Sequence, residues 1–121
     1  MKCLIALIAL FSFYASAADL DPKIAQLFQD QITAIEINDL SSFVKNGTAN
    51  FQDFKKADFD KVDKEYLPLF KAGYESTYLT SLKQEGLQVY LWKLSFKNGR
   101  DDILVKLAIN KENKIAGFWF Q

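Results

Sequence analysis

A chain of 121 residues with fifteen basic and fifteen acidic side chains is long enough for one domain and has no net charge. Without an excess of Lys and Arg, the composition gives no basis for binding nucleic acid through its phosphates. Half of the residues are apolar and eleven are Phe, which is the composition of a globular domain that can build its core from aromatic side chains.

The first residues form a segment of a different kind. Lys2 gives a short positive start, residues 4–13 are almost wholly apolar, and residues 15–17 (Ala-Ser-Ala) follow as an A-x-A site. This order is typical of a secretory signal peptide over residues 1–17, with cleavage after Ala17 or, as an alternative, after Ala18. The apolar run is shorter than a bilayer-spanning helix requires, which disfavours a membrane anchor.

We therefore expect a periplasmic or secreted protein whose residues 18–121 form a single domain, without a membrane segment after cleavage. Cleavage would remove Cys3, the single cysteine of the chain, so the domain must be held by its core rather than by disulfides. The chain also has no His. It therefore lacks the usual general base, the Ser-His and Cys-His nucleophiles, and the usual nitrogen and sulfur metal ligands. We expect no catalytic residue, no metal site and no cofactor.

Helices are predicted over about residues 22–72. Asp21 and Pro22 supply a cap and a first helical position, and apolar residues then recur at three- and four-residue spacing through residues 22–36. Asn38 or Asp39 can cap a second, shorter helix.

The rest of the helical half is predicted less directly. Residues 48–56 allow either a helical turn or a short edge strand. Asp58 is predicted to cap a further helix, which Pro68 would bend or end near Tyr66, and Gly73 would close this half of the chain.

From Tyr74 the apolar period changes from about 3.6 to 2, which predicts strands over about residues 73–121. Turn residues separate four strands, and Asn98-Gly99 is typical of a tight type I′ hairpin. Because short connections cannot join parallel strands, we expect a four-stranded antiparallel meander. The predicted fold class is thus α+β, with N-terminal helices packed on a curved sheet.

Both faces of the predicted sheet are largely apolar. Residues 87–97 place four large residues on one face: Tyr90, Trp92, Leu94 and Phe96. Leu87, Val89 and Leu91 point the other way, and in the last strand Phe118 and Phe120 are expected to oppose Ile115 and Trp119. A meander with one wet face should alternate cleanly between apolar and polar residues. One face should therefore pack on the helices and the other should meet a second subunit or a ligand, although the pattern leaves open which face does which.

Five aromatic residues are the candidates for a ligand site or an interface: Tyr78, Tyr90, Trp92, Phe118 and Trp119. Trp92 and Trp119 are favoured because Trp is enriched at interfaces. The expected partners are a second copy of the chain, a small apolar ligand or another exported protein.

The order of elements resembles the cystatin-like α+β roll and, more closely, the nuclear transport factor 2-like superfamily. The resemblance lies in the amphipathic first helix, the Gly73-Tyr74 entry to the sheet, the aromatic residues 89–94, and residues 113–120 at the end of the chain. A clear strand between the second and third helices, expected in that superfamily, is not evident.

The resemblance implies a cone-shaped fold with a pocket between sheet and helices, often in a homodimer packed through the sheet. It does not imply one activity, because its members include isomerases, dehydratases, immunity proteins and binding modules. We expect an exported interaction domain without catalytic activity. The alternatives are an isomerase or dehydratase that uses an Asp and a Tyr in an apolar pocket, and an inhibitor or immunity-type protein.

Overall fold

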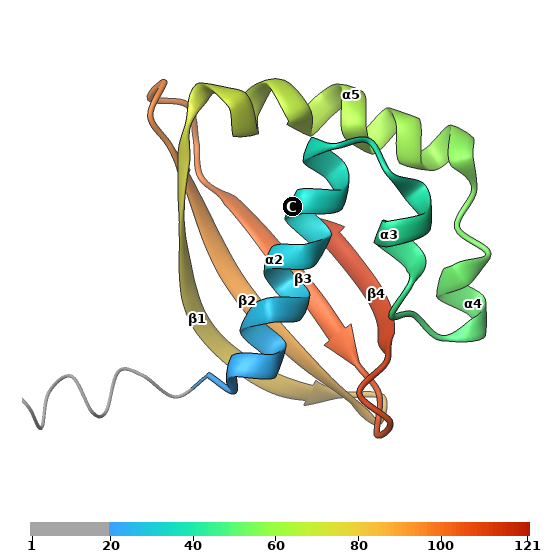
Figure 1. Cartoon of the computed structure of the whole chain (residues 1–121). Coiled ribbons are helices and arrows are strands. Elements are labelled where there is room, and N and C mark those ends of the chain that lie inside the picture. Colours follow the sequence, from blue (N-terminus) through green and yellow to red (C-terminus); the bar gives the residue numbers. More distant parts are fainter. Residues whose placement is uncertain (1–19) are drawn as a thin grey trace, which may run out of the picture.

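The computed structural model describes residues 20–121, so the predicted signal peptide lies outside the described residues. In this part of the chain, helices come first and strands follow (Figure 1). The elements are α2 (Pro22–Glu36), α3 (Leu40–Val44), α4 (Ala49–Gln52), α5 (Lys56–Ala72), β1 (Tyr74–Gln84), β2 (Leu87–Phe96), β3 (Ile103–Ile109) and β4 (Ile115–Phe120). The predicted α+β class is confirmed, and no helix within residues 20–121 is long and apolar enough to cross a membrane.

Helix α2 forms where the sequence predicts it. The Asp21 side chain accepts a hydrogen bond from the Lys23 N–H, and Pro22 occupies the first turn, where its missing N–H costs nothing. One side of the helix is buried and carries Ile24, Phe28 and Ile32. This stripe faces the sheet, as its spacing requires.

Two short helices follow. Asp39 caps α3 by accepting a hydrogen bond from the Ser42 N–H, and Thr48 caps α4 in the same way through the Phe51 N–H. Residues 48–56 thus contain a helical turn rather than an edge strand. The one strand-like contact near this segment is a single parallel bridge between Gly47 and Ile115.

The predicted cap of α5 is wrong, and Pro68 does not end the helix. The helix begins at Lys56, so Asp58 lies in the first turn and is not its cap, although a carboxylate there still meets the positive end of the helix dipole. The helix also continues through Pro68 to Ala72. Pro68 is exposed, and burial of Phe59 and Phe70 on either side of it holds the helix despite the lost backbone hydrogen bond.

The four strands pair in sequence order, β1-β2-β3-β4, and every pair is antiparallel, which is the predicted meander. The turn prediction at Asn98-Gly99 is wrong in detail. Only Gly99 has positive φ, and residues 97–102 lie between the two strands. The pair of positive φ values that a type I′ turn needs occurs at Glu85 and Gly86, between β1 and β2.

One residue of β4 lies on the other side of the sheet from that predicted. Ile115 pairs with Ile109, but Gly117 pairs with Ala108, so β4 contains one extra residue at this point. Such a bulge reverses the alternation of side chains that precede it. Ile115 is therefore fully buried with Phe118 rather than sharing a face with Trp119.

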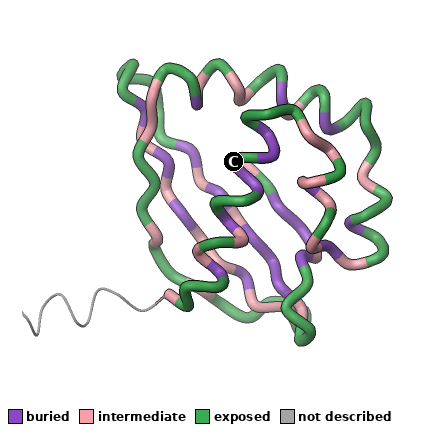
Figure 2. The backbone as a smooth tube through the Cα atoms, in the orientation of Figure 1, coloured by how far each residue is buried: buried purple, intermediate pink, exposed green. Residues whose placement is uncertain are grey.

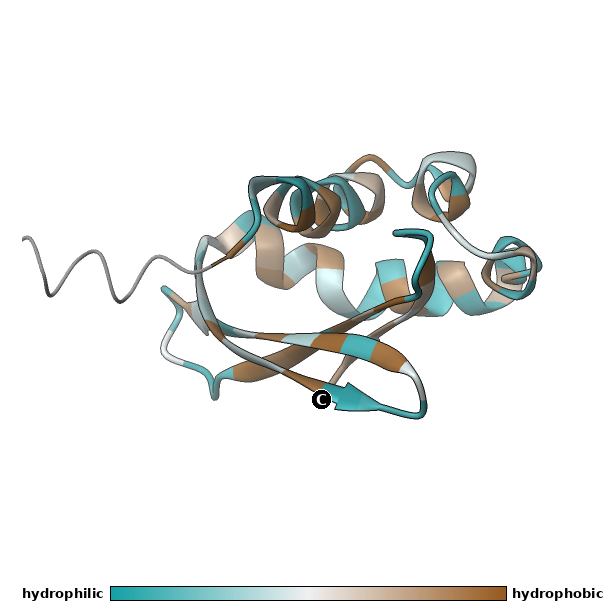
Figure 3. Cartoon of the chain, turned by 90° about the horizontal axis from the view of Figure 1, so that it is seen from below, coloured by the Kyte–Doolittle hydropathy of each residue, from teal (hydrophilic) through white to brown (hydrophobic). Residues whose placement is uncertain are grey.

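All the described helices lie on one side of the sheet (Figure 3). The core fills the space between the helices and the sheet, and buried residues recur along α2 and along β2, β3 and β4 (Figure 2). At its centre Phe28 of α2 stacks on Trp92 of β2, with ring centroids 4.1 Å apart. The two faces of the sheet therefore have different surroundings, and the face opposite the helices is free to contact a ligand or another protein.

Candidate interaction surface

The face of the sheet opposite the helices is uncovered, and about half of its residues are apolar. We call this surface the outer face; its residues, taken from the strand register, are Glu75, Thr77, Thr80, Leu82, Gln84, Leu87, Val89, Leu91, Lys93, Ser95, Leu104, Lys106, Ala108, Gly117 and Trp119. No described helix lies over it (Figure 3). An antiparallel sheet can leave one face in water, but such a face normally carries polar side chains.

Exposure varies across the outer face. Trp119 is 49% exposed and Leu82 is 37% exposed, whereas Val89 and Ala108 between them are buried. Since no helix covers Val89 and Ala108, side chains of the outer face itself must shield them. The result is a shallow apolar surface with a rim of large side chains.

Trp119 lies flat across its own strand. A Cβ atom added to Gly117 would overlap the six-membered part of the Trp119 indole. Gly117 is therefore needed because the indole rests directly on its backbone, not because of an unusual φ value. This contact fixes the position of the largest exposed side chain on the outer face.

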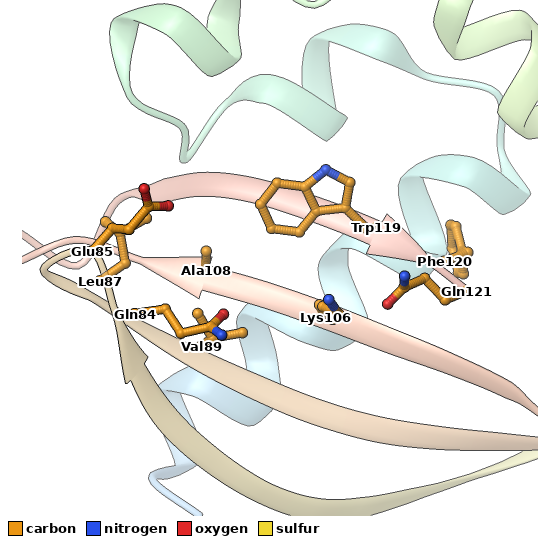
Figure 4. Close-up of a pocket in the computed structure, with 9 residues that line it drawn as sticks. All are labelled: Gln84, Glu85, Leu87, Val89, Lys106, Ala108, Trp119, Phe120 and Gln121. Carbon is orange, nitrogen blue, oxygen red and sulfur yellow. The ribbon is translucent and has the colours of Figure 1, made fainter.

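A pocket of about 270 Å³ opens beside Trp119 (Figure 4). Leu87, Val89 and Ala108 provide its apolar lining, and the remaining lining residues are Gln84, Glu85, Lys106, Trp119, Phe120 and Gln121. Glu85 lies toward one end, at the turn between β1 and β2, and Lys106 lies nearer Trp119. The single ion pair among the described residues is Lys56–Asp60 on α5, so neither pocket charge has an ion-pair partner within residues 20–121.

The five predicted site residues do not form one site. Trp119 belongs to the outer face, while the register places the other four on the helix side. Trp92 and Phe118 are buried in the core, where Trp92 stacks on Phe28. Trp92 is thus a packing residue. Of the two tryptophans, Trp119 is the one that is exposed.

Tyr78 and Tyr90 are half-buried at the margin of the core. The Tyr78 ring meets Trp92 edge-on, with centroids 5.4 Å apart, and lies 6.4 Å from the Tyr90 ring. Burial, together with the nearby Tyr78 and the Asp21 carboxylate, raises the pKa of Tyr90 above its ordinary value of 10.0. The Tyr90 hydroxyl therefore keeps its proton near neutral pH.

Sequence reasoning missed the smaller members of the outer face. Ala108 and Gly117 have no side chain that suggests a site, but they lie opposite each other in the register, and the Trp119 indole rests on Gly117. The signal that could have found Gly117 is its place within an apolar strand, since glycine there often marks a close approach.

A second cavity, of about 410 Å³, follows the free side of β4. We call it the edge groove; its lining residues are Phe43, Asn50, Phe51, Phe54, Val62, Glu65, Tyr66, Ala116, Gly117, Phe118, Trp119 and Phe120. Tyr66 stacks on Phe120 at 4.2 Å, and Phe43 meets Phe118 edge-on at 6.0 Å. Burial raises the pKa of Tyr66, and the neighbouring Glu65 adds to this effect.

An acid–tyrosine enzyme site would need a desolvated carboxylate in such a cavity. Glu65 and Tyr66 both line the edge groove, but Glu65 is exposed to solvent. Asp63 is buried, with one carboxylate oxygen lacking a hydrogen-bond partner, yet it lines neither the edge groove nor the Trp119 pocket. The buried acid and the cavity are thus in different places.

Within residues 20–121 there is no group of three or more Asp, Glu, His or Cys side chains placed to hold a metal ion. Comparison of the sequence with protein-family models and with curated proteins gives no match. The arguments about function therefore depend on the two apolar surfaces, the outer face and the edge groove.

Proposed function

We propose that this chain is a small exported interaction domain that associates through the outer face, in the first place with a second copy of itself. The observation that carries the proposal is the uncovered apolar sheet surface around Trp119 and Leu82. Contiguous exposed apolar surface of this kind marks association sites in soluble proteins. Export is supported by the signal-peptide pattern of residues 1–17.

Self-association is favoured over enclosure of a small ligand. The pocket beside Trp119, at about 270 Å³, is below the range of roughly 300–1,000 Å³ that is usual for ligand pockets. Its two charges also suit a two-fold contact. In an isologous interface, Glu85 of one copy can approach Lys106 of the other and the reverse contact follows by symmetry.

Size-exclusion chromatography with light scattering tests the proposal. We expect a dimer at micromolar concentration and a dissociation constant at least about tenfold weaker for Trp119→Ser, because central aromatic residues contribute more than about 1 kcal/mol to interfaces. Ile37→Ser is the matched control, because Ile37 is 61% exposed but lies at the end of α2, away from the sheet. A monodisperse monomer at high concentration would exclude self-association.

The resemblance to the nuclear transport factor 2-like superfamily agrees with this proposal, since its members often pair through the sheet. The second part of the test asks whether a different exported protein binds the same surface. If the chain is monomeric, capture of a periplasmic protein that depends on Trp119 but not on Ile37 would assign the outer face to that partner. Capture that is unchanged by Trp119→Ser would exclude the outer face as the binding surface.

A further inference from the structure

The free edge of β4 is the second unpartnered feature of the fold. The segment before α4 pairs with this edge at one point, where the Ile115 N–H donates to the Asn46 carbonyl and the Thr48 N–H donates to the Ile115 carbonyl. Beyond Ile115, no other described segment donates or accepts a main-chain hydrogen bond on this side of the strand. An open edge of this kind is a template for pairing with another chain.

The register identifies the free groups. Gln121 and Leu104 exchange both of their main-chain hydrogen bonds, so the alternation of an antiparallel ladder turns every second residue of β4 toward β3. Trp119 and Gly117 therefore direct their main-chain groups toward β3. Phe118 and Phe120 direct theirs outward, and each offers one N–H donor and one carbonyl acceptor to an added strand.

The edge groove lies beside these free groups. All five residues from Ala116 to Phe120 line it, and the opposite wall is made by residues of α4, of α5 and of the connection between them, including Phe51, Tyr66 and Phe54. Its volume of about 410 Å³ is within the usual range for a bound group. A main-chain ladder and an apolar cavity along the same strand are the two parts of a site for strand addition.

The charge of the edge groove indicates which kind of peptide can bind there. Glu65 is the one charged residue that lines the edge groove, and it forms no ion pair in the described part of the chain. Asn50 adds an amide at the opposite wall. An incoming chain with a Lys or Arg near its apolar residue would complement this rim, whereas an acidic chain would be repelled.

We propose that the β4 edge and the edge groove bind an extended peptide as a fifth strand. The peptide places large apolar side chains against Phe54 and Tyr66 and a Lys or Arg near Glu65. Its main chain pairs with Phe118 and Phe120. The edge groove shares Gly117 and Trp119 with the outer face, but peptide binding and self-association are measured separately, so the failure of either proposal leaves the other testable.

A slim extended segment fits the edge better than a second copy of the domain. Figures 1 and 3 show that α3, α4 and the start of α5 extend beyond β4 on the helix side. A two-fold axis that joined two β4 edges into one sheet would keep the helices of both copies on the same side. The overhanging helices of the two copies would then compete for the same space.

Blocked peptides test the proposal by nitrogen-15 NMR titration of the purified protein. The probe is acetyl-Lys-Thr-Phe-Thr-Phe-Thr-Lys-amide, which alternates apolar and polar faces. We expect saturable shifts at the amides of Phe118 and Phe120. Two N-methylated versions, one modified at both Phe and one at the Thr residues, block opposite edges of the peptide. One version should bind at least about tenfold more weakly and the other should bind like the parent.

Variants supply the second readout. Glu65→Lys should weaken the Lys-flanked peptide about two- to fivefold, as expected for an exposed ion pair, and should favour a Glu-flanked version. Val62→Trp should fill the groove and abolish binding, whereas Lys64→Trp, at an exposed position outside the groove, should not. Absence of binding, or equal binding of both N-methylated versions, would overturn the proposal. So would concentration-dependent shifts at Phe118 and Phe120 without peptide that persist in the Trp119→Ser variant, which would assign the edge rather than the outer face to a second copy.

Discussion

Both faces of the sheet carry apolar side chains, but the two faces have different surroundings. On the helix side, Leu94, Val105 and Leu107 are fully buried, and aromatic rings from α2, α3 and α5 pack against the strands. On the outer face, Trp119 and Leu82 remain exposed. The difference shows that hydrophobicity alone does not define the core of this domain. The helices cover one face only. Exposure of apolar surface on the other face to water is unfavourable in free energy, and association would bury that surface.

The largest contrast should come from the two tryptophans. We expect Trp92→Ala to reduce the free energy of unfolding by about 3–5 kcal/mol, because it leaves a cavity beneath Phe28. Trp119→Ala should cost about 1 kcal/mol or less under dilute conditions where the chain is monomeric, because half of its surface is already in water. Urea denaturation of both variants measures the difference. Equal losses would contradict the division of the sheet into a packed and an open face.

Gly117→Ala sharpens the description of the outer face. A methyl group at this position must displace the Trp119 indole, and we expect a loss of about 1–3 kcal/mol in unfolding free energy. In the Trp119→Ala background the same change should cost much less, since the obstructing ring is absent. A double-mutant cycle by urea denaturation measures this coupling. Additive effects would show that the indole does not rest on Gly117.

The smallest effect concerns the tyrosines at the margin of the helix side. Burial is the main cause that raises the pKa of Tyr74 and Tyr90 in the folded chain above the ordinary 10.0. Below pH 10 both states keep the protons and stability is unaffected by these groups. Above pH 10 the unfolded chain loses its protons first, so stability should fall until the folded pKa is passed. Urea denaturation across alkaline pH checks this, with Tyr90→Phe expected to show a shallower fall.

Much of the fold could be predicted because local signals agree with it. The period of residues 22–36, the caps at Asp21 and Asp39, and the change to a two-residue period at Tyr74 all indicate what the structure contains. The errors arose where tertiary packing overrides a local rule. Burial of Phe59 and Phe70 carries α5 through Pro68, and a single extra residue in β4 moves Ile115 into the core.

The candidate site was predicted only in outline. Alternation along residues 87–97 and 114–121 showed that both faces are apolar, but it could not show which face the helices cover. Trp92 and Trp119 were equivalent at that level, and only the register and the position of α2 separate them. The edge groove was not predicted, because it is assembled from α3, α4, α5 and β4, which are distant in the sequence.

The bridge between Gly47 and Ile115 has a consequence for the order in which the chain can fold. The helical half reaches its aromatic partners Phe118 and Phe120 only through the last strand, so Phe43 and Tyr66 have no such packing while synthesis is incomplete. Contacts so distant in sequence form late, because a long loop must close first. The packing of Phe43 and Tyr66 on the last strand is therefore expected to be among the last contacts of the core to form.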